Sequence, residues 1–147
     1  MQTASDLLKS KTKQMWSISP KATVFDALKL MAEKEIGALM VMDEKDKVVG
    51  IITERDYARK IILKGKTSSK ALVKEIMTPA EKMHCVKPDT PVEDCMVLMT
   101  GKRIRHIPVY DKDKYVGLIS IGDVVKSTIS SKDVLIERLS NYIGGTY

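Results

Sequence analysis

The chain has 147 residues, of which 44% are hydrophobic and 30% charged, and a formal net charge of +6. This composition excludes a disordered chain, and a chain of this length buries about 70% of the surface that its unfolded form exposes, enough for one domain with a core. No apolar run reaches the ~18 residues of a membrane-spanning helix and the N-terminus lacks an apolar signal core, so we expect a cytoplasmic protein without membrane contact.

A first block of mixed strand and helix pattern is expected at residues 17–64, after an N-terminal helix and entry segment at 1–16. Its apolar residues recur first at helical spacing and then in short runs, which is typical of a helix, two strands and a second helix. Gly37 is expected to break the first helix, and Gly65 to end the second. In chain order the elements are predicted at 17–20 (extended), 23–35 (helix), 38–42 and 48–52 (strands) and 53–63 (helix).

A second block is expected at residues 83–130, after a linker at 65–82 with a short helix that ends before Pro79. The sequence T-P-V-E, from Thr90 to Glu93, predicts a capping box with proline at the first helical position. In chain order the remaining elements are predicted at 85–88 (extended), from Thr90 onward (helix), 107–109 and 115–119 (strands), 120–129 (helix) and 131–147 (an amphipathic C-terminal helix and tail).

The two blocks carry the same sequence pattern. They match at an offset of 68 residues and, after one residue is lost in the hairpin connection, at an offset of 67. Two copies with so long a period indicate one two-fold object rather than an extended solenoid. Since neither block alone can bury both faces of its elements, we expect their sheets to share one core. The matched pairs include Pro20/Pro88, Val24/Val92, Leu30/Leu98, Gly50/Gly117 and Asp56/Asp123.

Each block ends its second strand with Gly, two apolar residues, a hydroxyl residue and, three positions further on, Asp. A hydroxyl residue at this distance from an acid is typical of a helix capping box. The same arrangement suits a nucleotide, because a helix N-terminus attracts phosphate and an ionised Asp accepts hydrogen bonds from ribose hydroxyls. The motif alone leaves both interpretations open. Its residues are Gly50, Thr53 and Asp56 in the first block and Gly117, Ser120 and Asp123 in the second.

The duplicated block, this motif, the I-M-T-P stretch that ends at Pro79 and the R-I-R-H-I-P-V stretch at 103–109 resemble a tandem pair of CBS domains, the Bateman module. The resemblance covers about Ser5 to Ile129. Within the family, the chain is similar to small stand-alone CBS-pair proteins of bacteria and plant mitochondria. It implies an α+β fold of two β-α-β-β-α units packed sheet to sheet with pseudo-two-fold symmetry, plus a C-terminal helix. It also implies an energy-sensing regulatory module without a catalytic cofactor, whose two clefts bind AMP, ATP, NAD(H) or S-adenosylmethionine.

The resemblance implies that one cleft is suited to phosphate-rich nucleotides. There Asp123 would hold the ribose and Ser120 a phosphate, while Arg105 and His106 would add positive charge. From the sequence alone, Arg105 and His106 are equally well explained as surface residues that cap a helix end. The residues expected to enclose adenine in this cleft are Trp16, Ile18, Ile36, Gly37 and Ala38, although a lone tryptophan is more often a core anchor.

The other cleft is expected to be weaker or differently selective. It would use Asp56 for the ribose and Thr53 for a phosphate, but Gly37 and Ala38 stand where the second block has Arg105 and His106. Arg55 is the residue that would compensate for the missing charge. The residues expected around the base are Met83, Cys85 and Ile104.

Three classes of function are compatible with these patterns. A nucleotide sensor that signals to an unidentified regulated protein is favoured, because no nucleophile or acid has a base partner apparent in the sequence. An enzyme that turns over an adenine nucleotide is one alternative. A nucleic-acid-binding protein is another, but Lys and Arg are interleaved with 19 acidic residues and form no basic stripe, so nucleic acid is not favoured.

Self-association is predicted from the helices, since residues 24–32 are apolar around more than one stripe. One face can pack on a sheet and the other needs a partner, so we expect a homodimer in which the helices of both blocks form a flat disc. The further apolar residues expected at this interface are Tyr57, Ile61, Ile62, Val124 and Val125.

Neither a metal site nor a disulfide is expected. Cys85 and Cys95 are the only cysteines and lie in no C-x-x-C motif, so both are predicted to be buried free thiols. His84 and His106 are the only histidines, too few for a structural zinc site with these cysteines.

Overall fold

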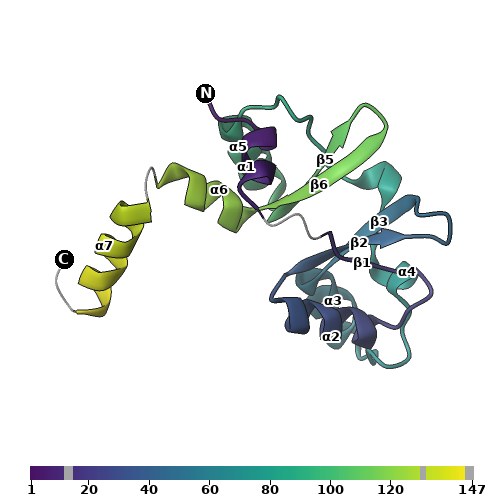
Figure 1. Cartoon of the computed structure of the whole chain (residues 1–147). Helices are drawn as coiled ribbons and strands as arrows, with labels where there is room; N and C mark the ends of the chain where they lie inside the picture. The colour runs from purple at the N-terminus through teal and green to yellow at the C-terminus, as the bar shows by residue number, and fades with distance from the viewer. Residues whose placement is uncertain (12–14, 130–131, 145–147) are drawn as a thin grey trace. The chain divides into compact units, whose positions relative to one another are not determined.

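The computed structural model describes residues 1–11, 15–129 and 132–144, and the chain divides into two compact units (Figure 1). Gln14–His84 forms what we call the first-repeat unit, and Met1–Lys13 with Cys85–Tyr147 forms the second-repeat unit. The N-terminal segment therefore folds with the second repeat, although it precedes the first repeat in the sequence.

The first-repeat unit is a four-stranded sheet, in the order β1-β2-β3-β4, with its helices packed against it. β1 runs parallel to β2, and the other neighbours are antiparallel. The predicted helix and hairpin are confirmed, whereas β4 was not expected in the linker. The elements are β1 Ser17–Ile18, α2 Val24–Lys34, β2 Ala38–Met42, β3 Val48–Thr53, α3 Glu54–Lys60, η1 Ile62–Lys64, α4 Val73–Ile76, β4 Thr78–Pro79 and η2 Ala80–Lys82.

The core of the first-repeat unit joins α2, the sheet and α4. Val24, Ala27 and Met31 lie on one face of α2 at helical spacing and are at most 2% exposed. They pack in one buried cluster with Leu39 and Ile52 of the sheet. Burial of each such aliphatic side chain stabilises the fold by about 1.5 to 3 kcal/mol, so this contact fixes the strand ends that carry the motif residues.

The second-repeat unit is built on the antiparallel hairpin of β5 and β6, with α1 and α5 in the same buried cluster. Val86 forms a parallel bridge to Val109, at the place predicted for the extended entry. Both strands are longer than predicted. The elements are α1 Ala4–Lys9, α5 Val92–Lys102, β5 His106–Asp111, β6 Lys114–Ser120, α6 Ile121–Thr128 and α7 Lys132–Ile143.

The two units repeat the same backbone irregularities. Helices α2 and α5 end at Glu35 and Arg103, both left-handed with a φ of 54°. The expectation that Gly37 breaks the first helix is therefore wrong. The carbonyl oxygens of the last turn accept hydrogen bonds from the Glu35 and Ile36 N–H groups, so the helix is already closed two residues before the glycine.

The repeat extends further than sequence similarity reveals. The α1 segment in one unit and the α4 segment in the other make the same backbone contacts. Val92 N–H donates to Gln2 O over 3.0 Å, and at the equivalent position Val24 N–H donates to Ala71 O over 2.9 Å. Each short helix thus covers the start of the repeat's first long helix. The further equivalent bonds are Ala4 N to Thr90 O with Val73 N to Ala22 O, and Ser5 N to Pro88 O with Lys74 N to Pro20 O.

The predicted capping box at Thr90 is wrong, because the N-terminal segment contacts the backbone at the start of α5. The side chain of Thr90 accepts the N–H of Lys87 over 3.0 Å within the turn before α5, and its carbonyl accepts the N–H of Ala4. Pro91 is the N-cap residue and makes no side-chain cap. The backbone of the N-terminal segment therefore satisfies a donor that a side chain was expected to satisfy.

The predicted C-terminal helix is confirmed as α7. Of its expected apolar stripe, Leu139, Tyr142 and Ile143 are 52%, 68% and 83% exposed. The side chains of Val134 and Leu135, and the predicted tail at 145–147, lie outside the described residues.

Substitution of Gly50 by Ala should destabilise the protein. An added Cβ would lie 2.5 Å from the Thr78 carbonyl oxygen, a backbone atom of β4 that cannot move without breaking the sheet. We expect a loss of about 1 to 3 kcal/mol in the free energy of unfolding, measured by urea denaturation. Gly101→Ala is the matched control, because an added Cβ there meets nothing within 4 Å. It should gain about 0.5 to 1 kcal/mol in α5, and equal effects would contradict the packing argument.

Candidate functional site

The motif of the second repeat forms a reciprocal cap where β6 ends and α6 begins. The Asp123 N–H donates to Ser120 Oγ over 3.2 Å, and Asp123 Oδ2 accepts the Ser120 N–H over 2.7 Å. The capping interpretation of this motif is therefore confirmed. A carboxylate has about four acceptor positions, so the cap leaves Asp123 able to accept further hydrogen bonds.

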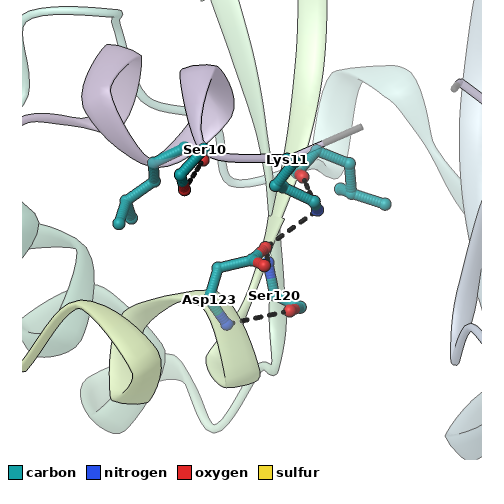
Figure 2. Close-up of polar contacts among 6 residues, drawn as sticks. Ser10, Lys11, Ser120 and Asp123 are labelled. Atoms are coloured by element: carbon teal, nitrogen blue, oxygen red, sulfur yellow. Dashed lines mark hydrogen bonds and ion pairs between the residues drawn. The ribbon is translucent and has the colours of Figure 1, made fainter. Parts of the chain in front are cut away.

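Lys11 is a third member of this site, and no sequence pattern indicated it. Its Nζ donates to Asp123 Oδ2 and to the Leu118 carbonyl oxygen, both over 2.8 Å, as Figure 2 shows. The Lys11 side chain comes from the end of the N-terminal segment, 112 positions from Asp123 in the chain. No motif links two residues so far apart, so only the packing of α1 on the second repeat reveals the contact.

Arg105 and His106 lie next to this cap. His106 is the first residue of β5 and pairs with Ser120, while the Arg105 carbonyl oxygen accepts the Ile121 N–H over 2.8 Å. The Arg105 side chain is exposed, and His106 is half-buried.

The imidazole of His106 is uncharged at neutral pH in this structure. Its pKa is lowered to about 4, mainly by burial and also by the nearby Lys11 ammonium and Arg105 guanidinium, while Asp123 acts in the opposite direction. The positive charge expected from this residue pair is thus carried by Arg105, and neutral His106 can act only as a hydrogen-bond donor or acceptor.

The first repeat has the same cap with a different lysine. Asp56 Oδ2 accepts the Thr53 N–H over 2.9 Å, and Thr53 Oγ accepts the Asp56 N–H over 3.2 Å. Lys60, one turn further along α3, lies 3.5 Å from Asp56 Oδ1, while its hydrogen bond runs to the Ile76 carbonyl oxygen over 2.8 Å. Ala38 pairs with Thr53 as His106 pairs with Ser120, and Arg55 lies in the first turn of α3.

The residues expected to enclose adenine are divided between the units. Trp16, Ile18, Ile36, Gly37, Ala38 and Met83 belong to the first-repeat unit, and Cys85 and Ile104 to the second. The clefts assigned from the resemblance each draw on both units, so these groupings stay predictions. Within the first-repeat unit, Trp16 packs against the core and Lys34 Nζ lies 4.3 Å from its ring centroid.

The prediction that both cysteines are buried is wrong for Cys85. Cys95 is fully buried in α5, but Cys85 is exposed. The next residue, Val86, packs against the core of the second-repeat unit and exchanges hydrogen bonds with β5. Because side chains alternate along an extended segment, Cys85 faces the opposite way.

A hollow of about 420 Å³ lies in the first-repeat unit where α2 ends and α3 begins. Ile36 and Gly37 line it, but so do the carboxylates of Glu35 and Glu54, which would repel a phosphate. We therefore do not assign the hollow to a nucleotide.

The described part of the chain contains no cluster of three or more His, Cys, Asp or Glu side chains able to hold a metal ion. Among residues 1–11, 15–129 and 132–144, no helix is both long and apolar enough to cross a membrane.

Comparison with known proteins agrees with the repeated units and their matching caps. The family model of the CBS domain matches residues 4–63 and 73–135. The chain belongs to the CBS-domain family. The CBS domain-containing protein CBSX3, mitochondrial, of Arabidopsis thaliana is 43% identical to this CBS pair over 152 residues, covering 99% of this chain and 73% of that protein.

Solved structures of CBS proteins share the fold. A protein with CBS domains from Burkholderia ambifaria has a TM-score of 0.84 and 47% identity, over 89% of this chain and 96% of that one. The structure of CBSX2, which is a complex with AMP, has a TM-score of 0.69 and 27% identity, over 87% of this chain and 96% of that one.

His106 should make the stability of the protein depend on pH. Because its pKa falls from 6.5 to about 4 on folding, the unfolded chain takes up a proton first as the pH is lowered. The stability that His106 contributes is complete above about pH 6.5 and is lost as the pH falls through about 4, at most about 3 kcal/mol. Urea unfolding of the wild type and His106→Asn between about pH 7 and pH 4 measures this loss. Equal losses in both proteins would show that His106 titrates normally.

Proposed function

We propose that this CBS pair is a regulatory module that binds an adenosine nucleotide, AMP, ATP or NAD(H), and passes the signal to a partner protein. The observation that carries the proposal is the Ser120 and Asp123 cap beside Arg105 and His106, in a family with a member solved as an AMP complex. The cap offers a carboxylate, a hydroxyl and a helix N-terminus, the groups that ribose and phosphate require.

Different residues of the second repeat would contact different parts of the nucleotide. Asp123 would accept the ribose hydroxyls, and Ser120 would donate to a phosphate oxygen. Arg105, exposed one residue before β5, would pair with phosphate in the two-pronged geometry that guanidinium allows. Neutral His106 would contribute a hydrogen bond and no charge. The adenine would lie against Trp16, Ile18, Ile36, Gly37 and Ala38 of the first-repeat unit.

We assign the second cleft to Asp56 and Thr53, with Met83, Cys85 and Ile104 around the base. Gly37 and Ala38 supply no charge there, and Arg55 is the cation nearest in sequence to the cap. This cleft should therefore favour a ligand with fewer phosphate charges, while phosphate-rich nucleotides favour the Asp123 cleft.

Regulation, rather than turnover, fits the chemistry of the site. In the described residues the Ser120 hydroxyl receives the Asp123 N–H, and Asp123 faces an ammonium group rather than a base. An activated nucleophile needs a base partner within hydrogen-bond reach. The ligand would act by binding one arrangement of the module better than another.

The expected location is the cytoplasm.

A homodimer through the helices is part of the proposal. Phe25 of α2, Val97 of α5 and Val125 of α6 are 52%, 70% and 53% exposed, more apolar surface than isolated helices of a monomer need to show. Two residues expected at this interface are not available to it, since Ile61 and Val124 are buried in the cores of their own units.

Adenosine nucleotides should bind, and Asp123 should determine the affinity. At 100 times its dissociation constant a ligand adds ~2.7 kcal/mol of stability, so a thermal-shift panel of AMP, ADP, ATP, NAD, NADH and S-adenosylmethionine detects it. Asp123→Asn keeps an acceptor for the Ser120 N–H but loses the charge, and should weaken AMP binding by about tenfold or more. Asp56→Asn should weaken AMP binding much less.

Asp6→Asn is the matched control, because Asp6 accepts the Thr3 N–H over 2.9 Å in a similar cap at the start of α1. It should leave nucleotide affinity unchanged. No shift with any of the ligands would refute the proposal. Product formation from AMP, ATP or NAD on long incubation would establish the enzyme alternative, and RNA affinity that falls steeply with salt would favour nucleic acid.

The dimer prediction is tested by sedimentation at micromolar concentration. We expect the wild type to sediment as a dimer and Val97→Glu or Phe25→Glu to shift it toward monomer, because each places a charge in an apolar interface. Lys29→Glu, at an exposed polar position of α2, is the control for added negative charge. A wild-type monomer would contradict the prediction.

A further inference from the structure

The Lys11 contact with Asp123 is the best-defined ion pair of the second-repeat unit, and neither the capping nor the nucleotide interpretation requires it. Its atoms are 2.8 Å apart, and the two side chains are 36% and 17% exposed. The exposed pair of Lys21 and Glu44, by contrast, leaves its side chains 73% and 84% exposed. An ion pair shielded in this way is screened less by salt and holds its geometry better.

The contact has no counterpart in the first repeat. The equivalence of α1 and α4 places Ala80 where the second-repeat unit has Lys11, one residue after β4 ends. Lys60 approaches Asp56 from its own helix, and its 2.8 Å hydrogen bond goes to a carbonyl group rather than the carboxylate. In the described residues, Asp123 thus pairs with a cation from a distant segment, whereas Lys60 reaches Asp56 from the same helix.

The lysine neutralises the charge of the carboxylate that a ribose would need. Lys11 Nζ donates to Oδ2, the same oxygen that caps the Ser120 N–H, and the second Lys11 bond to Leu118 directs the ammonium group onto the carboxylate from the β6 side (Figure 2). A ribose that donates hydroxyls to Asp123 meets a carboxylate already bound by two donors, one of them charged. Both donors form charge-assisted hydrogen bonds to the carboxylate, but only the ammonium group also carries a full positive charge, so exchanging Lys11 for a neutral hydroxyl opposes ligand binding.

We infer that Lys11 is an intramolecular competitor for the Asp123 carboxylate, so that the ribose hydroxyls of an adenosine nucleotide bind there against the ammonium group and with lower affinity. This inference rests on the proposed function and adds its regulation.

Lys11→Met tests the competition, since it keeps the length and apolar stem of the side chain and removes the charge. Calorimetric titration with AMP and with adenosine should show about tenfold tighter binding of both ligands to the variant, equivalent to about 1.4 kcal/mol. Adenosine isolates the ribose from the phosphate. If Lys11 instead served the phosphate, AMP would bind more weakly to the variant, and that result overturns the inference. Lys9→Met, an exposed change at the last residue of α1, should leave both affinities unchanged.

Different results contradict the competition by Lys11 and the proposed function. Nucleotide binding that depends on Asp123 but is equal in the wild type and Lys11→Met contradicts the competition and is consistent with the proposed function. No binding by either protein contradicts both proposals. Binding by the variant alone supports both.

A second measurement distinguishes the loss of the Lys11 charge at the site from a general destabilisation of the fold by the substitution. In Lys11→Met the pKa of His106, followed by NMR, should rise because a neighbouring cation is gone. An unchanged pKa would show that Lys11 does not reside at the site in solution, which would also overturn the inference. Lys11→Gln should reproduce both effects.

Discussion

The structure depends on one pair of backbone contacts, through which a segment distant in the chain covers the start of each repeat's first long helix. Val92 N–H is satisfied by Gln2 O, and Val24 N–H by Ala71 O. An unpaired N–H at a buried helix start costs free energy comparable to a lost hydrogen bond, so each repeat needs its covering segment. As a result the segment that precedes the first repeat completes the second, and the linker that follows the first repeat completes the first.

This arrangement also explains the two glycines of the motif. Gly50 makes room for the backbone of β4 at Thr78, and Gly117 makes room for Leu8 of α1, since an added Cβ would lie 2.5 Å and 2.7 Å from them. The glycine thus serves the covering segment rather than a ligand, and the chain must pass close to the strand end where the capping Asp lies. In the second-repeat unit that passage brings Lys11 to Asp123. Lys11 therefore lies at the site because the covering segment of this unit packs against β6.

The caps show why one set of residues can carry two roles. A reciprocal Ser120 and Asp123 cap is a structural requirement of α6, and it fixes the carboxylate in one orientation. The same fixed carboxylate is what a sensor of ribose would need, because a preorganised acceptor loses less entropy on binding. The difference between the repeats then lies in the neighbours: Arg105, His106 and Lys11 surround one cap, whereas Gly37, Ala38 and Lys60 surround the other.

Sequence patterns predicted the duplicated unit, the order of its main strands and helices and the motifs at Thr53 and Ser120, because these depend on local periodicity and on residues three positions apart. They misplaced the end of α2, where Glu35 takes the left-handed conformation that a glycine was expected to provide, and they missed the role of Thr90. Tertiary structure alone decided which segment covers which repeat, that Cys85 is exposed, that burial and nearby cations lower the pKa of His106, and that Lys11 meets Asp123. These features depend on contacts between residues far apart in the chain, which local patterns do not encode. Ala4 and Leu7 are buried at the positions equivalent to Val73 and Ile76, although the segments 2–8 and 71–77 have no identical residue.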